Sequence, residues 1–491
     1  MRTAMTSNRT SPFPARRWLV LLIGLAAAPA QATDLLSVAR DALLNDAGLA
    51  SARAELERVG AGRDVERGGL LPQLSAGSSL THNRTYSSQG RGGQVGDPGG
   101  VGDGLVVDDE QDFNSLSISL DASQALYDAS RFAQLERAER LTGQQALSLE
   151  VAEQQLLFDV ASAYFEILRA ADILEARRSQ ETAISRQLEQ AEERFEVGLT
   201  AITDVFEAQA SFDLARAQRI AAENALQISF EALERLTDQR YASIDGLSDE
   251  LPVEPPSPAE RNAWVEMALL NSPMLMMAEA GIEVARSDLD IARAGRLPTL
   301  EAFANYQYSD TDRSGVSGYN SDSQLGLRAS VPLYTGGTTS AQIRQNTFGL
   351  EVSQYDFEAQ RRDTVQQVRS LYTQVSNDVE TVEARRQAIA SNQSALDATR
   401  SGYEVGTRNI VDVLNAEQNL FNAIADYAEA RYDYVLGLLE LRQQSGTLDG
   451  EAIQGVNQWL DASQGISLDL PDEAGDDHPA MNIGTRPAPP A

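Results

Sequence analysis

The chain has 491 residues, 42% of them hydrophobic, which is enough for several domains with buried cores. The absence of cysteine excludes a disulfide framework, a thiol nucleophile, a cysteine-ligated zinc site, an iron–sulfur cluster and a lipid-modified cysteine. Its 72 acidic and 40 basic residues give a net charge of −32 and argue against binding to nucleic acid, which needs a basic surface. Two histidines leave little for metal binding or Ser/His catalysis, so we expect no cofactor, no metal and no enzymatic function.

Residues 1–32 have the pattern of a secretory signal peptide. A basic beginning is followed by an apolar run from Trp18 to Ala28 and by Ala30-Gln31-Ala32, a cleavage site of the A-x-A type. The alternative, a transmembrane anchor, needs a longer apolar run. No later stretch approaches about 18 consecutive apolar residues. The mature chain is therefore expected in the periplasm, outside the cell, or in the outer membrane as β-strands.

The rest of the chain contains two copies of one unit. Phe195–Gln209 (FEVGLTAITDVFEAQ) recurs as Tyr403–Glu417 (YEVGTRNIVDVLNAE), with seven of fifteen positions identical. Leu71–Leu74 (LPQL) likewise recurs as Leu297–Leu300 (LPTL). Between the copies lies a proline-rich linker, which cannot be helical. We therefore divide the chain into a signal peptide (1–32), a first repeat (33–238), a linker (239–262), a second repeat (263–446), a further segment (447–470) and an acidic, proline-rich tail that is expected to be disordered (471–491).

Each repeat is predicted to contain a helix, two strands, a very long helix, a break and another helix. Residues 116–122 and 325–333 alternate between apolar and polar side chains, as a strand with one apolar face does. Partner strands begin near Leu71 and Leu297, although Phe303 breaks the alternation. Strands of about 12 to 15 residues can cross a bilayer when tilted, but a soluble hairpin with one wet face alternates in the same way. Segments rich in Gly, Ser, Asp and Asn are expected to connect the strands (87–104 and 309–323).

The predicted helices are unusually long. Residues 131–196 contain no proline and would form a helix of about 99 Å, whereas 34–68 and 203–238 would total about 106 Å end to end. The second repeat shows the same match, with 263–295 and 410–444 against 337–404. A long helix beside two shorter ones placed end to end predicts the wall of a long helical cylinder.

Four membrane-type strands in one chain cannot close a barrel. Open strand edges are not tolerated in lipid, and the smallest known barrels have about eight strands. An eight-stranded barrel, which two chains would give, is filled by its own side chains. A transport channel therefore favours three chains.

The two helix breaks are the most informative short motifs, at 197–205 (VGLTAITDV) and 405–413 (VGTRNIVDV). Each has a glycine suited to the left-handed position after a helix, then Thr or Asn to cap the next helix. Asp204 and Asp412 would lie in the first turn of that helix, where its dipole favours a carboxylate. These residues alone leave two interpretations open, ordinary helix ends or the far tips of a cylinder about 100 Å from the strands.

The breaks resemble the two hairpin tips of the TolC family of outer-membrane channel proteins. The resemblance covers nearly all of 33–450 and includes the LP-x-L strand starts, Ala163-Tyr164-Phe165, Arg186-Gln187-Leu188, Leu333–Gly337 (LYTGG) and Ser445–Leu448 (SGTL). It implies a homotrimer in which each protomer gives four strands to a 12-stranded membrane β-barrel. It also implies a coiled-coil α-helical barrel through the periplasm and a small mixed equatorial domain built from the linker and the segment after 446.

The resemblance further implies a function. The protein would be a passive exit channel in the outer membrane for tripartite efflux, type I secretion or both. It would contact outer-membrane lipid, dock a periplasmic adaptor (membrane fusion protein) and work with an inner-membrane transporter. The docking tips would comprise Val197, Gly198, Leu199, Thr200, Val405, Gly406 and Thr407. The alternative is a periplasmic coiled-coil adaptor or a structural protein of the cell envelope, but an adaptor would have one hairpin and no spanning strands.

The periplasmic gate of the family also maps onto this sequence. Tyr403 and Arg408 match constriction residues that tie the second hairpin to neighbouring helices. Part of that tie runs through the positions of Thr203 and Asp204. Arg408 and the nearby acids would equally be ordinary solvated charges at a helix end if the resemblance were set aside.

One position departs from the family pattern. Asp412 matches the first of two aspartates that ring the channel entrance, but the second position is Asn415. A trimer would present one ring of three carboxylates instead of two. Because like charges held together attract cations, we expect a weaker preference for cations here.

Overall fold

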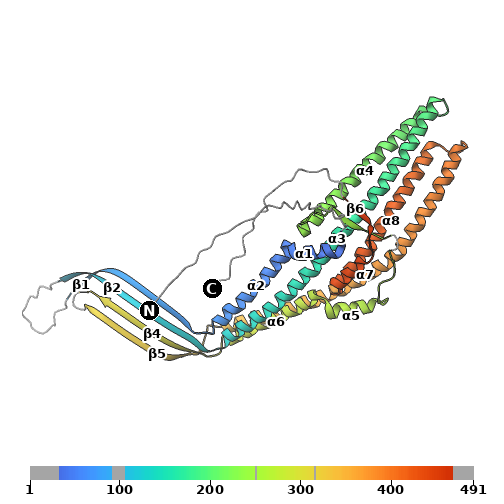
Figure 1. Cartoon of the computed structure of the whole chain (residues 1–491). Coiled ribbons are helices and arrows are strands. Elements are labelled where there is room, and N and C mark those ends of the chain that lie inside the picture. Colours follow the sequence, from blue (N-terminus) through green and yellow to red (C-terminus); the bar gives the residue numbers. More distant parts are fainter. Residues whose placement is uncertain (1–32, 91–105, 249–250, 314–316, 468–491) are drawn as a thin grey trace, which may run out of the picture.

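The computed structural model describes residues 33–90, 106–248, 251–313 and 317–467. An elongated body of helices carries a sheet at one end and two hairpin tips at the other (Figure 1). The predicted signal peptide, most of the glycine-rich segment at 87–104 and the acidic tail lie outside the described residues. Within the described part of the chain, every helix is too short or too polar to cross a bilayer.

The helices of the first repeat are α1 (Leu35–Asn45), α2 (Ala47–Gly68), α3 (Ala129–Glu196) and α4 (Ile202–Thr237). The 68 residues of α3 make a helix of about 102 Å, and both α2 and α4 pack along it. The single helix predicted over 34–68 is instead two helices. Asp46 adopts an extended conformation after α1, and its carboxylate accepts a hydrogen bond from the backbone N–H of Leu49 at 2.6 Å. Asp46 thereby ends one helix and caps the next.

The helices of the second repeat are α5 (Arg261–Asn271), α6 (Pro273–Ala294), α7 (Thr338–Glu404) and α8 (Ile410–Gln444). Here too the structure divides the first predicted helix, 263–295, at Ser272. Pro273 begins α6, and a residue that precedes proline is driven towards an extended backbone. The two repeats therefore break at equivalent places, and α5 packs on the side of α7 (Figure 1).

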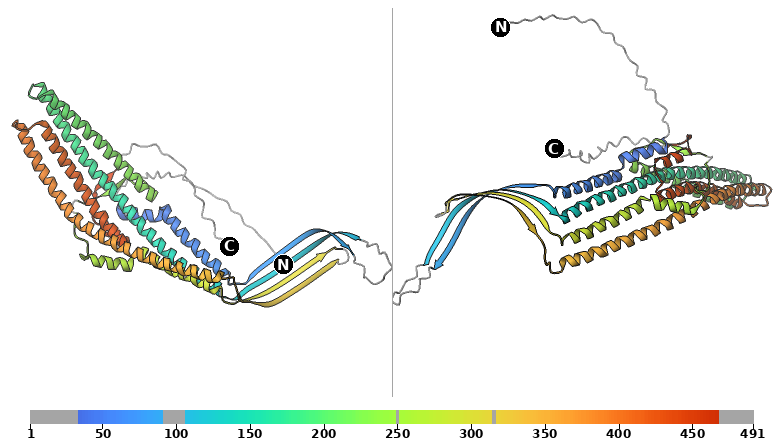
Figure 2. Two further views of the ribbon diagram at one scale, coloured as in Figure 1. Left: turned by 180° about the vertical axis from the view of Figure 1, so that it is seen from behind. Right: turned by 90° about the horizontal axis from the view of Figure 1, so that it is seen from below.

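The strands of both repeats form one antiparallel sheet in the order β1-β2-β4-β5. Figure 2 shows that the four strands curve together away from the ends of the helices. The two strands of the first repeat are longer than predicted, because their pairing continues to Gly90 and Val106. Pairing of the other two continues to Thr311 and Gly318, so the predicted loop there is shorter. The bounds are β1 (Gln73–Gly90), β2 (Val106–Asp128), β4 (Thr299–Thr311) and β5 (Gly318–Ser330).

The strand register gives this sheet one apolar and one polar face. Leu120 is opposite Tyr306, and Leu325 is opposite Ala304, on the same face. Leu325 is 86% exposed and Leu74 is 79% exposed, so this apolar face is uncovered in the single chain. The other face carries serine, asparagine, glutamine and charged side chains.

The residue that breaks the predicted alternation, Phe303, lies on the polar face. Its ring covers Gly326 on β5, where an added Cβ would be 3.0 Å from the ring. The guanidinium of Arg328 lies 4.8 Å from the centroid of the same ring. Phe303 therefore fills the space left by a glycine on the neighbouring strand and supports a charged side chain.

The linker and the segment after the second repeat meet at mid-length, as the family resemblance implies for an equatorial domain. There β3 (Ser243–Leu247) pairs antiparallel with β6 (Leu460–Ser467), and α9 (Gly450–Asn457) precedes β6. The hydroxyl of Tyr164 on α3 donates to the backbone oxygen of Asp245 on β3 at 2.8 Å. Burial raises the pKa of Tyr164, so this hydroxyl stays a donor.

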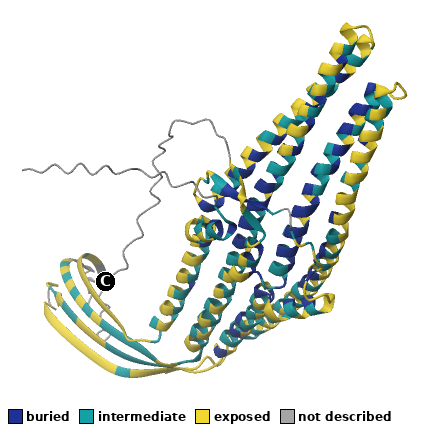
Figure 3. Cartoon of the chain, turned by 45° about the vertical axis from the view of Figure 1, so that its right-hand side comes forward, coloured by how far each residue is buried: buried dark blue, intermediate teal, exposed yellow. Residues whose placement is uncertain are grey.

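Buried side chains gather in the middle of the helical body and continue towards the tips (Figure 3). The largest cluster joins α1, α3, α4, α8 and the equatorial sheet. A smaller cluster near the tips joins the two hairpins and consists of Ile184, Ala191, Ala208, Ala215, Ile410 and Leu414. Its alanines allow close helix approach but bury little apolar area, so the hairpins are held less firmly there than at mid-length.

Candidate functional site

The first tip joins α3 to α4 through a tight turn. Gly198 has φ of +75°, the left-handed conformation expected at this position. The backbone N–H of Gly198 donates to Phe195 O at 2.9 Å, and that of Leu199 donates to Arg194 O at 2.8 Å. These bonds satisfy the last carbonyls of α3 and leave the side chains of Val197 and Leu199 exposed.

The second tip joins α7 to α8 through a turn of the same kind. Gly406 has φ of +80°, and the N–H of Thr407 donates to Gly402 O at 2.9 Å. Asn409 then caps α8 reciprocally with Asp412, because each side chain accepts a hydrogen bond from the backbone N–H of the other. Val405 is 75% exposed, so this tip also presents apolar surface to its surroundings.

The two tips differ in how the second helix is capped. The residue before α4 is Ala201, whose side chain cannot cap a helix, so the expected threonine cap is absent. Instead the hydroxyl of Thr200 hydrogen-bonds to the carboxylate of Asp204 in the first turn of α4. The hydroxyl of Thr203 is 3.5 Å from the same carboxylate, a long contact. The first tip therefore lacks the reciprocal cap of the second.

The structure brings together only some of the gate residues that the sequence indicates. Arg408 Nη1 lies 3.8 Å from Asp412 Oδ2 on the same hairpin. Tyr403 lies under the guanidinium of Arg194, which is 4.8 Å from the ring centroid. Among the described residues, no hydrogen bond or ion pair joins Thr203 or Asp204 to the second hairpin, and Asn415 is exposed on α8. Within one chain, therefore, the link between hairpins at Tyr403 runs through Arg194, a residue that sequence reasoning missed.

A second group that sequence reasoning missed lies just behind the tips. Glu417 on α8 has a side chain that is 0% exposed. Its Oε1 accepts hydrogen bonds from Gln187 on α3 at 3.0 Å and from Arg400 on α7 at 2.8 Å. The signal was present in the sequence, because Glu417 occupies an apolar position in the helical spacing of Val413 and Leu420. A charged side chain on the buried face of a helix needs a partner, but several polar residues of the long helices could be that partner, so the sequence alone does not identify it.

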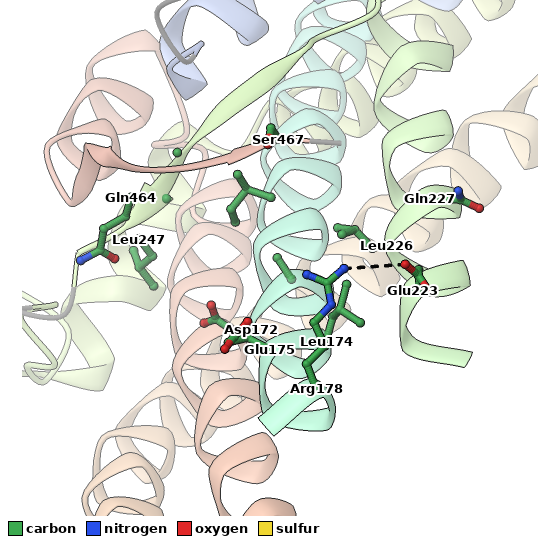
Figure 4. Close-up of a pocket in the computed structure, with 14 residues that line it drawn as sticks. Asp172, Leu174, Glu175, Arg178, Glu223, Leu226, Gln227, Leu247, Gln464 and Ser467 are labelled. Carbon is green, nitrogen blue, oxygen red and sulfur yellow. Dashed lines mark ion pairs between the residues drawn. The ribbon is translucent and has the colours of Figure 1, made fainter. Parts of the chain in front are cut away.

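A cavity lies between α3, α4 and the β3–β6 sheet (Figure 4). It has a volume of about 400 Å³, and Arg178 pairs with Glu223 across it at 3.7 Å. Asp172, at its wall, accepts a hydrogen bond from the hydroxyl of Tyr432 at 2.7 Å. Burial and the neighbouring carboxylate raise the pKa of Tyr432. Three of the charged side chains that line this cavity, Asp172, Arg178 and Glu223, are thus used in internal contacts. No group of three or more His, Asp and Glu side chains able to hold a metal ion is found in the described part of the chain.

Known proteins resemble this chain over most of its length. The outer membrane efflux protein family matches residues 38–239 and 264–447, close to the bounds of the two predicted repeats. Outer membrane protein TolC of Vibrio cholerae is 35% identical over 443 residues, covering 89% of this chain and 96% of that protein. The alkaline protease secretion protein AprF of Pseudomonas aeruginosa is 32% identical over 414 residues, covering 83% of each chain.

Solved structures show the same fold. The CmeC outer membrane channel of Campylobacter jejuni matches with a TM-score of 0.68 and 17% identity, covering 87% of this chain and 90% of that one. At that identity the likeness concerns the fold alone, whereas the family match and the identity to TolC concern descent. The chain therefore belongs to the outer membrane efflux protein family, together with TolC.

Proposed function

We propose that this protein is an outer-membrane exit channel, a passive duct through which an inner-membrane transporter expels its cargo. The observation that carries the proposal is the uncovered apolar face of the four-stranded sheet, at the end of a helical body about 100 Å long. Lipid is the solvent that suits such a face, and a body of that length can extend through the periplasm. The family membership supports the same function.

The open edges of the sheet support assembly into a trimer. Its outer strands, β1 and β5, have no further strand partner among the described residues. In lipid, unpaired backbone groups cost several kcal/mol each, so these edges need partners. Three copies joined edge to edge would give a closed barrel of about 12 strands, wide enough for a channel. The polar face, with Phe303 and Arg328, would then line the channel.

The hairpin tips would act at the opposite end as gate and docking surface. Exposed apolar side chains at Val197, Leu199 and Val405 offer a surface for a periplasmic adaptor. Asp412 would ring the entrance, with Arg408 close to its carboxylate. Among the described residues, Thr203 and Asp204 make no hydrogen bond or ion pair with the second hairpin of their own chain, so their proposed ties to Tyr403 and Arg408 would run between copies.

We propose that the cargo is not selected by residues of this chain. The relatives include AprF, which is named for protease secretion, and an outer membrane efflux protein named BepC from Brucella suis. We propose a duct that serves type I secretion, efflux or both, with the inner-membrane transporter deciding the cargo. The alternative of a periplasmic adaptor does not account for the second hairpin or for the apolar face.

The test begins with purified protein in a planar bilayer. We expect discrete conductance steps in the bilayer. Protein taken from an outer-membrane fraction should run on a gel as a trimer band that dissociates on heating. A monomer found only in the soluble periplasmic fraction, without conductance, would contradict the proposal.

The partners can be identified with the same protein, because the chain contains no cysteine. A single substitution, Thr200→Cys or Asn409→Cys, allows a photo-crosslinker to be attached at either tip in cells. Capture of an adaptor would support docking at the tips, and the transporter encoded beside it would suggest the cargo. Capture of outer-membrane proteins alone would contradict the assignment of the tips to the periplasm.

A further inference from the structure

A groove rich in arginine runs along α7 beside the beginning of α5, and we call it the arginine groove. It has a volume of about 1020 Å³. Its charged lining residues are Arg261 of α5 and, from α7, Arg361, Arg362, Arg369 and Asp378. The net charge of the whole chain is −32, so four arginines in one groove make a local positive surface on an acidic protein. Such a surface favours an acidic partner.

The arginines of this groove are only partly paired within the chain. Glu358 pairs with Arg361 at 2.8 Å and with Arg362 at 2.9 Å, so one carboxylate serves two guanidinium groups at one end of the groove. Arg261 and Arg369 are exposed, and among the described residues their guanidinium groups have no hydrogen bond or ion pair. The groove therefore keeps positive charge that the described part of the chain does not neutralise.

The first turn of α5 adds to the positive potential of the groove. The hydroxyl of Tyr372 on α7 donates to the backbone oxygen of Ala259, and Trp264 Nε1 donates to that of Pro258 at 2.8 Å. These bonds hold the beginning of α5 against α7. No side chain caps this end of α5, and the free N–H groups of a first helical turn attract carboxylates. The helix end and the arginines thus suit the same partner, a series of carboxylates.

The chain itself supplies such a series directly after β6. Five carboxylates fall within nine residues and no basic residue lies among them, an acidic segment that comprises Asp469, Asp472, Glu473, Asp476 and Asp477. This acidic segment (469–477) lies outside the described residues, which end at Ser467. Ten extended residues span up to about 33 Å, so the carboxylates can act at a distance from the end of β6.

The direction of β6 leads the chain away from its own groove. After β3 the linker crosses α8, where the N–H of Glu254 donates to the hydroxyl of Tyr434 at 3.2 Å, and then reaches α5. Because β6 is antiparallel to β3, Ser467 at its end is opposite Ser243 at the start of β3. Ser467 there lines the cavity between α3 and α4 (Figure 4). The acidic segment therefore begins near α4, whereas its own arginine groove lies on α7.

The proposed trimer would bring a second groove to this place. The helices α4, α3, α8 and α7 lie side by side in that order, so α4 and α7 are at opposite edges of the chain (Figure 1). The edge of α4 is also the edge of α2 and β1, and the edge of α7 is that of β5. If β1 of one copy pairs with β5 of the next, α4 of the first copy faces α7 of the second. The acidic segment of one copy would thus begin beside the arginine groove of its neighbour.

We propose that the acidic segment of each copy binds in the arginine groove of the neighbouring copy and joins the copies at mid-length. Carboxylates and guanidinium groups form charge-assisted hydrogen bonds, and the free groups of Arg261 and Arg369 are the available donors. Because these charges are exposed, the contact weakens as salt screens it. The inference rests on the proposed function, since it requires the trimer, and it assigns a binding partner to the C-terminal tail.

Disulfide formation tests where the acidic segment lies, because the chain contains no cysteine. Gln366→Cys places a thiol in the groove, and Ala474→Cys places one in the acidic segment. We expect oxidation of the double variant to give covalent dimers and trimers on a denaturing gel, since the two thiols would belong to different copies. The matched control pairs Ala474→Cys with Gln387→Cys, because Gln387 is an exposed glutamine of α7 about 31 Å further along the helix. The single variants give the background.

Charge variants show whether the arginines hold the acidic segment. Arg369→Glu should lower the yield of covalent trimer about fivefold. Arg344→Glu should leave it unchanged, because Arg344 is an exposed arginine of the same helix outside the groove. Raising the ionic strength from about 0.1 to 1 M should also lower the yield, since the Debye length falls from about 10 to 3 Å. Replacing the five acids by Asn and Gln should lower the temperature at which the trimer dissociates, and only at low salt.

The other outcomes contradict the proposed contact. Equal crosslinking at Gln366 and Gln387, or a disulfide within one copy that leaves its mass on the gel unchanged, would exclude binding to the neighbour's groove. If Gln366→Cys stays protected from a maleimide reagent after the five acids are neutralised, another occupant covers the groove. A conducting trimer without the crosslink overturns this contact alone. A protein that forms neither trimer nor channel overturns the proposed function as well.

Discussion

Gly402 lies directly beneath the side chain of Arg408. A Cβ at this position would be 2.8 Å from Arg408 Cγ, and the carbonyl of Gly402 accepts backbone hydrogen bonds from Thr407 at 2.9 Å and Arg408 at 3.2 Å. The turn therefore fixes the base of the arginine, and the guanidinium reaches Asp412 at 3.8 Å. Because Gly402 has no side chain, Arg408 can pack against its backbone, and this contact positions the guanidinium.

We expect Arg408→Ser to loosen the proposed gate. The substitution removes the proposed ties between Arg408 and Thr203 or Asp204 of a neighbouring copy. It also removes the contact with Asp412 within the same hairpin, which as an exposed pair is worth about 1 kcal/mol or less. Single-channel recording should show a modest rise in mean conductance. Arg386→Ser, which removes a similar exposed pair with Glu383 at 2.7 Å away from the tip, is the control. Equal conductance in all three proteins would assign Arg408 to an ordinary helix end.

Asn415 provides a test in which selectivity for cations is expected to increase. Asn415→Asp would add a second ring of three carboxylates near Asp412 in the proposed trimer, so selectivity for cations should increase. Asp412→Ala should reduce it. Reversal potentials under a salt gradient measure both effects, which should be larger at low salt because screening is weaker there. Identical reversal potentials in the three proteins would mean that position 415 lies away from the ion path.

Whole helices were more predictable than their interruptions. The long helices expected over 131–196 and 337–404 are observed at Ala129–Glu196 and Thr338–Glu404. A long run of helix-forming residues without proline is enough to predict such helices from the local sequence alone. The breaks at Asp46 and Ser272 were missed, because aspartate and serine are tolerated within helices and proline within a first turn. Asp46 and Pro273 permit a turn locally, and packing of the flanking helices along α3 and α7 then favours it.

Contacts between elements were the least predictable part of the candidate site. The repeats placed both tips, and the left-handed glycines at 198 and 406 are observed. Glu417 and Arg194 were missed because their partners are on other helices. A sequence shows that a charge occupies an apolar stripe, but the rotation and register of the neighbouring helices determine which side chain faces it.

At mid-length, α7 and α8 hold two carboxylates close together. Asp433 accepts a hydrogen bond from Arg169 on α3 at 2.6 Å, whereas Oδ2 of Asp378 is buried without a partner in the described structure. Burial, and then the charge of Asp433, raise the pKa of Asp378. At neutral pH the charged form of Asp378 therefore lowers the free energy of unfolding of the protein.

We expect Asp378→Asn to raise the melting temperature at neutral pH, because it removes that unfavourable charge. The pKa of Asp378 is raised in the folded state, so the cost of its charge is fully present above that pKa. The cost shrinks as the pH falls below it and is gone once the unfolded chain is protonated as well. The gain from the substitution should accordingly shrink in acid. Thermal unfolding at several pH values measures the effect, with Asp363→Asn on the exposed side of α7 as control. A gain that is the same at every pH would point to a cause other than titration.

The sheet shows what alternation predicts and what it leaves open. The apolar and polar faces follow from residue spacing, but spacing does not explain why an aromatic side chain, Phe303, lies on the polar face. Its place on the polar face makes sense only in the observed register, where Gly326 on β5 is its neighbour and Arg328 lies over its ring. Pairing between strands therefore explains the one residue that disagreed with the pattern.

Two adjacent residues on β5 test which face meets lipid. Leu325→Lys would place a charge on the apolar face, which costs about 2–4 kcal/mol in the middle of a bilayer. We expect it to lower the amount of heat-modifiable trimer in the outer membrane. Gln324→Lys places the same charge on the polar face and should assemble normally while changing ion selectivity. Equal assembly of both variants would contradict the proposed orientation of the sheet.

The outer strands β1 and β5 set the order of events in biogenesis. A single copy cannot enter the membrane first and find its partners later, because two rows of unpaired amide and carbonyl groups would enter hydrocarbon with it. In the proposed trimer, the three copies would therefore have to meet in the aqueous periplasm, with their apolar faces still uncovered and prone to aggregate. The yield of mature protein would then depend steeply on its concentration, and a chaperone that shields these faces before association would raise that yield.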